Sequence, residues 1–213
     1  MSFLADLFER LRDLPALVQW AGYFGLTAII FTETGLFFGF FLPGDSLLVT
    51  AGLLASQGFA LDVYQLGLLL NVAAIVGDNT NYWIGRLTGA RIFNRSESIF
   101  FHRKHVDRAH AFYEKHGPKT VVLARFMPII RTFAPLVAGV GRMDYKVFLT
   151  FSILGGTVWI WSMLFTGYFL GQYVPGIDKR IELVIITVIF LSILPGLLAW
   201  LKERRHATQV AGK

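Results

Sequence analysis

The pentapeptide Leu42-Pro43-Gly44-Asp45-Ser46 interrupts a long apolar stretch and decides how this chain folds. Proline lacks a backbone N–H and its ring blocks the preceding helical turn, while glycine permits a sharp change of direction. A helix that enters the pentapeptide is therefore expected to end there, and Asp45 or Ser46 is suited to cap a helix that follows. We predict a broken helical hairpin over residues 15–61.

A second interrupted stretch, RFMPIIRTFAP at residues 125–135, carries two prolines amid apolar residues. Broken backbone at membrane depth is tolerated only where protein or a wet cavity satisfies its polar groups. We therefore expect residues 15–61 and 120–145 to form two re-entrant hairpins that line a common cavity. The residues at the two breaks are candidates for lining or gating it: Pro43, Gly44, Pro128 and Pro135.

The composition excludes an ordinary soluble domain. Of the 213 residues, 54% are hydrophobic and 16% charged, and the mean hydropathy is +0.55, whereas charged residues make up about a quarter of soluble domains. Three further stretches are predicted to be transmembrane helices, at 63–86, 147–171 and 181–201. The fold class is an all-α polytopic membrane protein in a single membrane domain. The absence of cysteine excludes disulfides and thiolate metal sites.

Charge at the segment ends indicates an orientation. Residues 87–119 form a basic loop and residues 202–213 a basic tail, and the positive-inside rule places both in the cytoplasm. Apolar and charged residues fall on opposite faces of an N-terminal helix at 1–14, which predicts an interfacial amphipathic helix. The loop has no nucleic-acid recognition motif and its histidines match no zinc signature, so neither nucleic acid nor a metal is an expected partner.

A weak internal sequence similarity relates the two interrupted stretches. Ala51-Gly52 ends the first and Ala138-Gly139 ends the second, and a helix rich in glycine and aromatic residues follows each. Such a similarity is typical of an inverted repeat, which places a transporter site near the membrane midplane. Coincidence in a glycine-rich apolar chain is the competing explanation. Gly-x3-Gly pairs in the same helices fit either packing within one bundle or a homo-oligomer contact.

Four charged side chains lie inside or beside these apolar segments: Glu33, Asp45, Arg125 and Arg131. A charge at full lipid depth is unfavourable by at least about 2.5 kcal/mol unless it is paired, hydrated or displaced. Purely structural ion pairing between the two halves is one interpretation, but buried pairs are often no better for stability than apolar packing. That comparison favours a functional role. Asp78 and Asn81 are also candidates for the cavity wall, with interhelical hydrogen bonding as an equal alternative.

Residue chemistry narrows that role. Arginine stays protonated and offers a planar fork of donors, so Arg125 and Arg131 suit a phosphate head group. A carboxylate in a low-dielectric site binds a proton more readily than one in water, so Glu33 or Asp45 is a candidate proton acceptor. Together these residues predict anion binding that protons regulate. Nothing in the sequence calls for a cofactor.

Three spaced motifs, taken in order, make the chain recognisable. Residues 41–47 read FLPGDSL, Gly77-Asp78-x3-Tyr82-x2-Gly85-Arg86 follows, and Arg125-Phe126-x-Pro128-x2-Arg131-x6-Ala138-Gly139 completes the set. Over roughly residues 15–200 the chain resembles the DedA family of bacterial inner-membrane proteins.

The resemblance implies a re-entrant-hairpin fold related to eukaryotic lipid scramblases. It also implies a flippase role in recycling undecaprenyl phosphate across the cytoplasmic membrane, dependence on the proton motive force, membrane homeostasis and drug resistance. The family's functional acidic and arginine positions fall on Glu33, Asp45, Arg125 and Arg131.

Two other functions compete with lipid-phosphate transport. A polyprenyl pyrophosphate phosphatase would need a nucleophile and a base near the arginines, and no such arrangement is evident, so the chain is not expected to be an enzyme. A proton-coupled exporter of small cationic drugs would use the acidic pair to bind its substrate. The expected partners are membrane lipids, a polyprenyl phosphate and protons.

Overall fold

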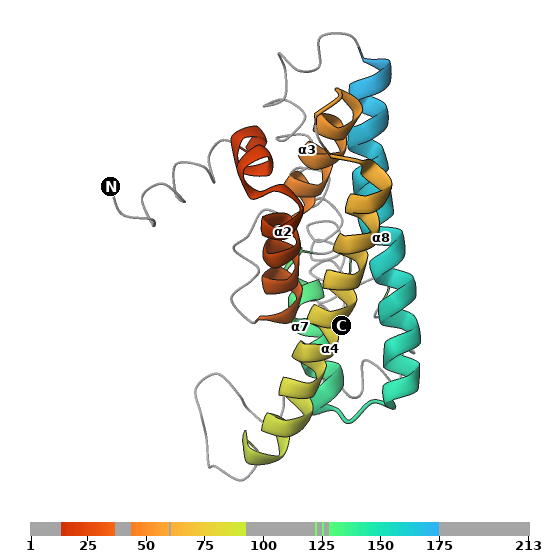
Figure 1. Cartoon of the computed structure of the whole chain (residues 1–213). Helices are drawn as coiled ribbons and strands as arrows, with labels where there is room; N and C mark the ends of the chain where they lie inside the picture. The colour runs from red at the N-terminus through yellow and green to blue at the C-terminus, as the bar shows by residue number, and fades with distance from the viewer. Residues whose placement is uncertain are drawn as a thin grey trace, which may run out of the picture.

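The computed structural model describes residues 14–36, 44–59, 61–92, 122, 125 and 128–174, and every regular element within them is a helix (Figure 1). The helices are α2 (Leu14–Gly35), α3 (Gly44–Ser56), α4 (Val63–Ile92), α7 (Pro128–Val140) and α8 (Tyr145–Tyr173). The predicted all-helical class is confirmed over this part of the chain. The predicted segments at 181–201 and 202–213, nearly all of 1–14 and most of the loop 87–119 lie outside the described residues, as does Pro43.

The helices fall into two length classes. Helices α2 and α8 are long and apolar enough to cross a membrane. Helix α4 has 30 residues, but its polar side chains keep it out of that apolar class. Helices α3 and α7 have 13 residues each, so at 1.5 Å per residue they are about 20 Å long, against a hydrocarbon core of about 30 Å. Neither short helix can span a bilayer alone.

The helix boundaries agree with some of the predicted breaks and correct others. Helix α3 begins at Gly44, inside the pentapeptide, and Asp45 and Ser46 lie in its first turn instead of capping it. Residues 37–43, which precede it, lie outside the described residues. Helix α7 begins at Pro128, a favourable first position because a missing N–H costs nothing there. It then continues through Pro135, which therefore does not break the segment. Helix α4 runs to Ile92, past the predicted end at 86.

Two helix crossings are built alike. A β-carbon at Gly52 of α3 would collide with the carbonyl oxygen of Leu164 in α8, and one at Gly167 of α8 would collide with that of Val49 in α3. Gly52 thus lies against the carbonyl of the residue three positions before Gly167. Gly167 in turn lies against the carbonyl of the residue three positions before Gly52. The two helices run parallel, because Asp45 at the start of α3 contacts Trp159 of α8, and Ser56 at the end of α3 lies against Gly171 of α8. Small residues at such a crossing let two backbones approach closely.

The crossing of α7 with α4 repeats the same register. A β-carbon at Gly139 would collide with the carbonyl oxygen of Tyr82, and one at Gly85 would collide with that of Leu136. Helix α3 therefore packs on α8, which follows α7 in the chain. Helix α7 packs on α4, which follows α3. In Figure 1, α3 lies along α8 and α7 lies beside α4, the long helix near the centre of the bundle.

The apolar core lies between α2, α3, α4 and α8, where residues such as Leu17, Leu48 and Leu66 are fully buried. A smaller cluster forms around Tyr82, whose ring stacks on Phe148 with centroids 4.5 Å apart. Helix α2 bends at Gly22, whose φ of 54° lies in the left-handed region that glycine tolerates. The first turn of each short helix lies near the middle of a long helix, because Asp45 contacts Trp159 of α8 and the Thr132 carbonyl accepts from Asn81 of α4.

Candidate functional site

Charged side chains from four helices are buried together with Arg125. Glu33 lies in the last turn of α2, Asp45 in the first turn of α3, Arg131 in the first turn of α7 and Asp78 in the middle of α4, while Arg125 precedes α7. Every one of these residues is at most 8% exposed. The four charged residues predicted from the sequence therefore share one buried region, joined there by Asp78.

Arg131 is shared by two carboxylates. Its Nη1 donates to Oδ1 of Asp45 and its Nη2 donates to Oε1 of Glu33, and both contacts are ion pairs. The indole of Trp159 completes this group. Its ring centroid lies 4.6 Å from the guanidinium carbon of Arg131, and its Nε1–H donates to Oδ1 of Asp45 at 2.8 Å. One guanidinium therefore ties together α2, α3 and α7, and it packs on α8.

Glu33 and Arg131 each keep one polar atom without a partner. Oε2 of Glu33 and Nε of Arg131 are buried and accept or donate no hydrogen bond among the residues that the structure describes. Gly44 explains how Glu33 fits, because a β-carbon there would collide with the Glu33 carboxylate. Gly44 thus leaves room for a charged group, and its lining or gating of a cavity stays a prediction. Buried unpaired polar atoms are unfavourable and point to a ligand or a proton.

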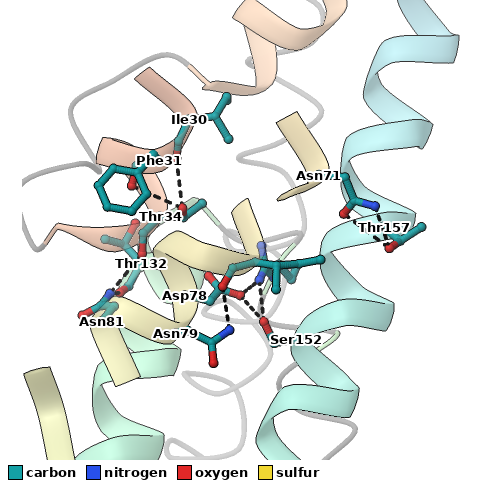
Figure 2. A network of polar contacts seen from close by, with 12 residues as sticks. Ile30, Phe31, Thr34, Asn71, Asp78, Asn79, Asn81, Thr132, Ser152 and Thr157 are labelled. Atoms are coloured by element: carbon teal, nitrogen blue, oxygen red, sulfur yellow. Dashed lines mark hydrogen bonds and ion pairs between the residues drawn. The ribbon is translucent and has the colours of Figure 1, made fainter. Parts of the chain in front are cut away.

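Arg125 pairs with a carboxylate of α4. Its ion-pair partner is Asp78 on α4, and its Nη2 also donates to the hydroxyl of Ser152 at 3.3 Å. The Ser152 hydroxyl in turn donates to Oδ2 of Asp78 at 2.5 Å (Figure 2). The structure thus contains the ion pairs between the two halves that one interpretation of the sequence expects. Arg131 pairs with Glu33 and Asp45, whereas Arg125 pairs with Asp78. The close contact of the Arg125 side chain with α8 is at Gly155, where a β-carbon would lie 3.2 Å from Cγ of Arg125.

The remaining described candidates lie in α4 and α7. The side-chain amide of Asn81 donates to the backbone carbonyls of Thr34 at 3.2 Å and Thr132 at 2.7 Å, which favours the interhelical hydrogen-bonding alternative for this residue (Figure 2). Pro135 is buried in α7, and Pro128 begins that helix. No cluster of three or more potential metal ligands occurs within the described ranges.

The sequence reasoning did not identify Trp159 or Ser152. Both are fully buried on α8, and they lie seven residues apart, which places them on the same helical face. Gly155 and Gly156 lie between them. A polar and glycine-containing face on an otherwise apolar helix is the sequence signal that would have located this side of the site.

The formal charges of the site do not cancel. Three carboxylates, those of Glu33, Asp45 and Asp78, face the two guanidinium groups of Arg125 and Arg131, which leaves one excess negative charge among the buried residues described. Uptake of one proton, or of one cation, would make the cluster neutral. The arrangement can therefore exchange charge with a bound species, which a fully matched set of ion pairs would do less readily.

Comparison with known proteins identifies the family. A family model for the VTT domain matches residues 42–169, more than half of the chain. The chain is also 46% identical to the protein DedA of Escherichia coli K12 over 212 residues, which cover 99% of this chain and 96% of that protein. It belongs to the DedA family.

Other relatives of this DedA-family chain are also named as membrane proteins. It is 44% identical over 189 residues to an uncharacterised membrane protein of Mycobacterium tuberculosis H37Rv, covering 87% of this chain and 82% of that protein. It is 36% identical over 172 residues to the inner membrane protein YqjA of Escherichia coli K12, with coverages of 79% and 75%. No solved structure matches the chain. With two apolar helices of spanning length, the DedA-family chain is a membrane protein.

The family match contains most of the site. Asp45, Asp78, Arg125, Arg131 and Trp159 all lie within residues 42–169, whereas Glu33 precedes them. The last turn of α2 therefore brings a charged residue from outside the matched domain into contact with Arg131. In this DedA-family structure, the site is complete only when α2 packs against the domain.

Proposed function

We propose that this DedA-family protein transports a lipid phosphate, undecaprenyl phosphate, across the bacterial cytoplasmic membrane, and that protons drive or regulate the transport. One observation carries the proposal: Arg131 is held by two buried carboxylates, yet its Nε and the Glu33 Oε2 have no partner among the described residues. A guanidinium restrained by groups that can be neutralised is suited to bind an anion reversibly.

Phosphate and proton binding are linked by this arrangement. A carboxylate that binds a proton loses its charge and its hold on Arg131, which frees part of the guanidinium fork for phosphate oxygens. When the phosphate leaves, the carboxylate loses its proton and pairs with Arg131 again. Phosphate is therefore expected to bind together with a proton taken up by Glu33 or Asp45. The Arg125–Asp78 pair beside them offers a second guanidinium for the same head group.

The helix lengths and crossings support a transporter architecture. Helices α3 and α7 are too short to span a bilayer, and each crosses a long helix through the same reciprocal pair of glycines. We infer that they belong to two re-entrant hairpins related as an inverted repeat. Rocking of such repeats against each other exposes a midplane site to either side in turn.

The membrane and the orientation are part of the proposal. The relative YqjA is named as an inner membrane protein, and the basic residues of the loop 87–119 and the tail 202–213 favour the cytoplasmic side by the positive-inside rule. In this orientation the site would exchange undecaprenyl phosphate between the two leaflets of the cytoplasmic membrane.

The proposal is tested by reconstituting the full chain in liposomes that contain undecaprenyl phosphate in one leaflet. Movement of the lipid to the other leaflet is expected to be faster than in empty liposomes, faster still with a proton gradient, and lost in Arg131→Ala. The control is Arg142→Asn, which removes an exposed arginine at a backbone position of positive φ that asparagine tolerates. Equal movement in folded Arg131→Ala and wild-type protein would contradict the proposal.

The excess negative charge supports a second candidate, a proton-coupled exporter of small cationic drugs. In that case the unpartnered Oε2 of Glu33 would contact the cation directly. Proton flux through liposomes that depends on an added cationic drug, and not on undecaprenyl phosphate, would favour the exporter. We infer that the protein is not an enzyme. Release of phosphate from undecaprenyl pyrophosphate by the purified chain would contradict that inference.

A further inference from the structure

The two carboxylates that share Arg131 are held unequally. Oδ1 of Asp45 accepts two hydrogen bonds, one from Nη1 of Arg131 and one from the indole Nε1–H of Trp159. Asp45 also lies in the first turn of α3, where the helix dipole stabilises a negative charge. Two hydrogen-bond donors and a helix N-terminus therefore hold the Asp45 carboxylate in place.

Glu33 has the opposite surroundings. Only its Oε1 accepts a hydrogen bond, from Nη2 of Arg131, while its Oε2 lacks a partner within the described part of the chain. It lies in the last turn of α2, where the helix dipole destabilises a negative charge. The charged groups that act on Glu33 are Arg131, Asp45 and Arg125, and the charge of Arg125 is opposed by Asp78 of α4.

We infer that Trp159 is a positioning residue that keeps Asp45 ionised on Arg131, so that Glu33 is the carboxylate that takes up the proton. The inference deepens the proposed function and rests on it for its role in transport. It also assigns the phosphate to one edge of the guanidinium. Nε and Nη2 of an arginine lie on the same edge, so departure of Glu33 from Nη2 joins that group to the already unpartnered Nε. This edge offers two parallel donors to a phosphate.

The position of Trp159 fits this role. Its side chain is fully buried, and its ring lies 4.6 Å from the guanidinium carbon of Arg131 and 6.0 Å from that of Arg125. The ring face thus restrains both arginines while the indole N–H restrains Asp45. Nη1 of Arg131 stays hydrogen-bonded to Asp45 when the bond between Nη2 and Glu33 breaks. The orientation of the freed guanidinium edge therefore does not change.

The test measures carboxyl protonation directly, without any phosphate lipid. Infrared difference spectra are recorded on the purified full chain in lipid nanodiscs as the pH is lowered, and the C=O band of a buried protonated carboxyl is compared between variants. The band is expected in the wild type, lost in Glu33→Gln and retained in Asp45→Asn. Labelling the glutamate carboxyl carbons with ¹³C should shift the same band in the unmutated chain, so the assignment holds even if a variant fails to fold.

Trp159→Phe keeps an aromatic ring and removes only the N–H donor. A second protonated-carboxyl band is expected in this variant, and the double variant Trp159→Phe/Asp45→Asn should return to one band. The matched control is Trp161→Phe on the same helix, whose ring contacts Tyr64 and Phe165 instead of the site. Its spectrum is expected to equal that of the wild type.

The two proposals fail in different ways. A band that survives in Glu33→Gln and disappears in Asp45→Asn would overturn the assignment of Glu33 even if the wild type transports undecaprenyl phosphate. An unchanged single band in Trp159→Phe would overturn the role of Trp159. Expected spectra from a chain that moves no lipid phosphate would support the inference about protonation and contradict the proposed transport.

Discussion

The variant Arg125→Met is expected to lose about 3–5 kcal/mol of its free energy of unfolding, because the change leaves the Asp78 carboxylate buried without its cation. The full range applies because Arg125 and Asp78 are 3% and 1% exposed, so solvent screens neither charge. Asp78→Asn should lose a similar amount, since it leaves the guanidinium uncompensated.

The double variant separates pairing from packing. If the two losses were independent, Arg125→Met/Asp78→Asn would lose about 6–10 kcal/mol, twice the single loss. Because the partner charges disappear together, we expect it to be more stable than either single variant. Its remaining loss should be about 1–3 kcal/mol, mainly from weakened hydrogen bonding at Ser152.

The free energy of unfolding can be measured by titrating the protein from mixed micelles with a denaturing detergent. Tryptophan fluorescence is a suitable signal, because the ring of Trp159 lies 6.0 Å from the guanidinium carbon of Arg125. The control Lys146→Met changes an exposed residue and should shift stability by no more than about 0.5 kcal/mol. Additive losses in the double variant would refute the reasoning, since they would mean that the two charges do not depend on each other.

Four further variants test the packing around the site by the same unfolding measurement. Gly52→Val and Gly139→Val should each lose about 1–3 kcal/mol or more through overpacking against a neighbouring backbone, and a large loss in one with none in the other would contradict the similarity of the two crossings. Asn81→Leu should lose about 1–3 kcal/mol, because two backbone carbonyls lose their side-chain donor; unchanged stability would show that water replaces it. Tyr82→Phe should lose about 1 kcal/mol with its 2.6 Å hydrogen bond to the Met143 carbonyl, and a stability equal to wild type would refute a role for that bond.

Local chemistry explains which parts of the fold could be predicted. The break before α3 follows from a proline and a glycine in sequence, and the start of α7 follows from Pro128. Pro135 misled the prediction because its effect depends on context: a helix that is supported by its neighbours can continue through a proline. Such support depends on contacts between distant segments, which a local pattern does not contain.

The sequence identified most of the charged residues of the site, but it did not predict which carboxylate pairs with which arginine. Charges in apolar segments are rare enough to stand out, so Glu33, Asp45, Arg125 and Arg131 were identified. Which carboxylate contacts which arginine depends on how α4 packs against α2, α7 and α8. Asp78 was therefore predicted only as a residue of the cavity wall. Trp159 was missed because tryptophan is common in apolar helices: Trp20 is 51% exposed, whereas Trp159 is 0% exposed.

Each short helix packs mainly on a long helix from the other half of the chain, and this has a consequence for biosynthesis. Helix α3 packs chiefly on α8, and α7 packs on α4, so neither half of the chain contains the main partner of its own short helix. At a synthesis rate of roughly 5–20 residues per second, α3 must wait on the order of several seconds before α8 emerges. During that interval Asp45 lacks both Arg131 and Trp159. The newly made first half is thus an incomplete folding unit, and the insertion machinery has to hold a short charged helix until the second half arrives.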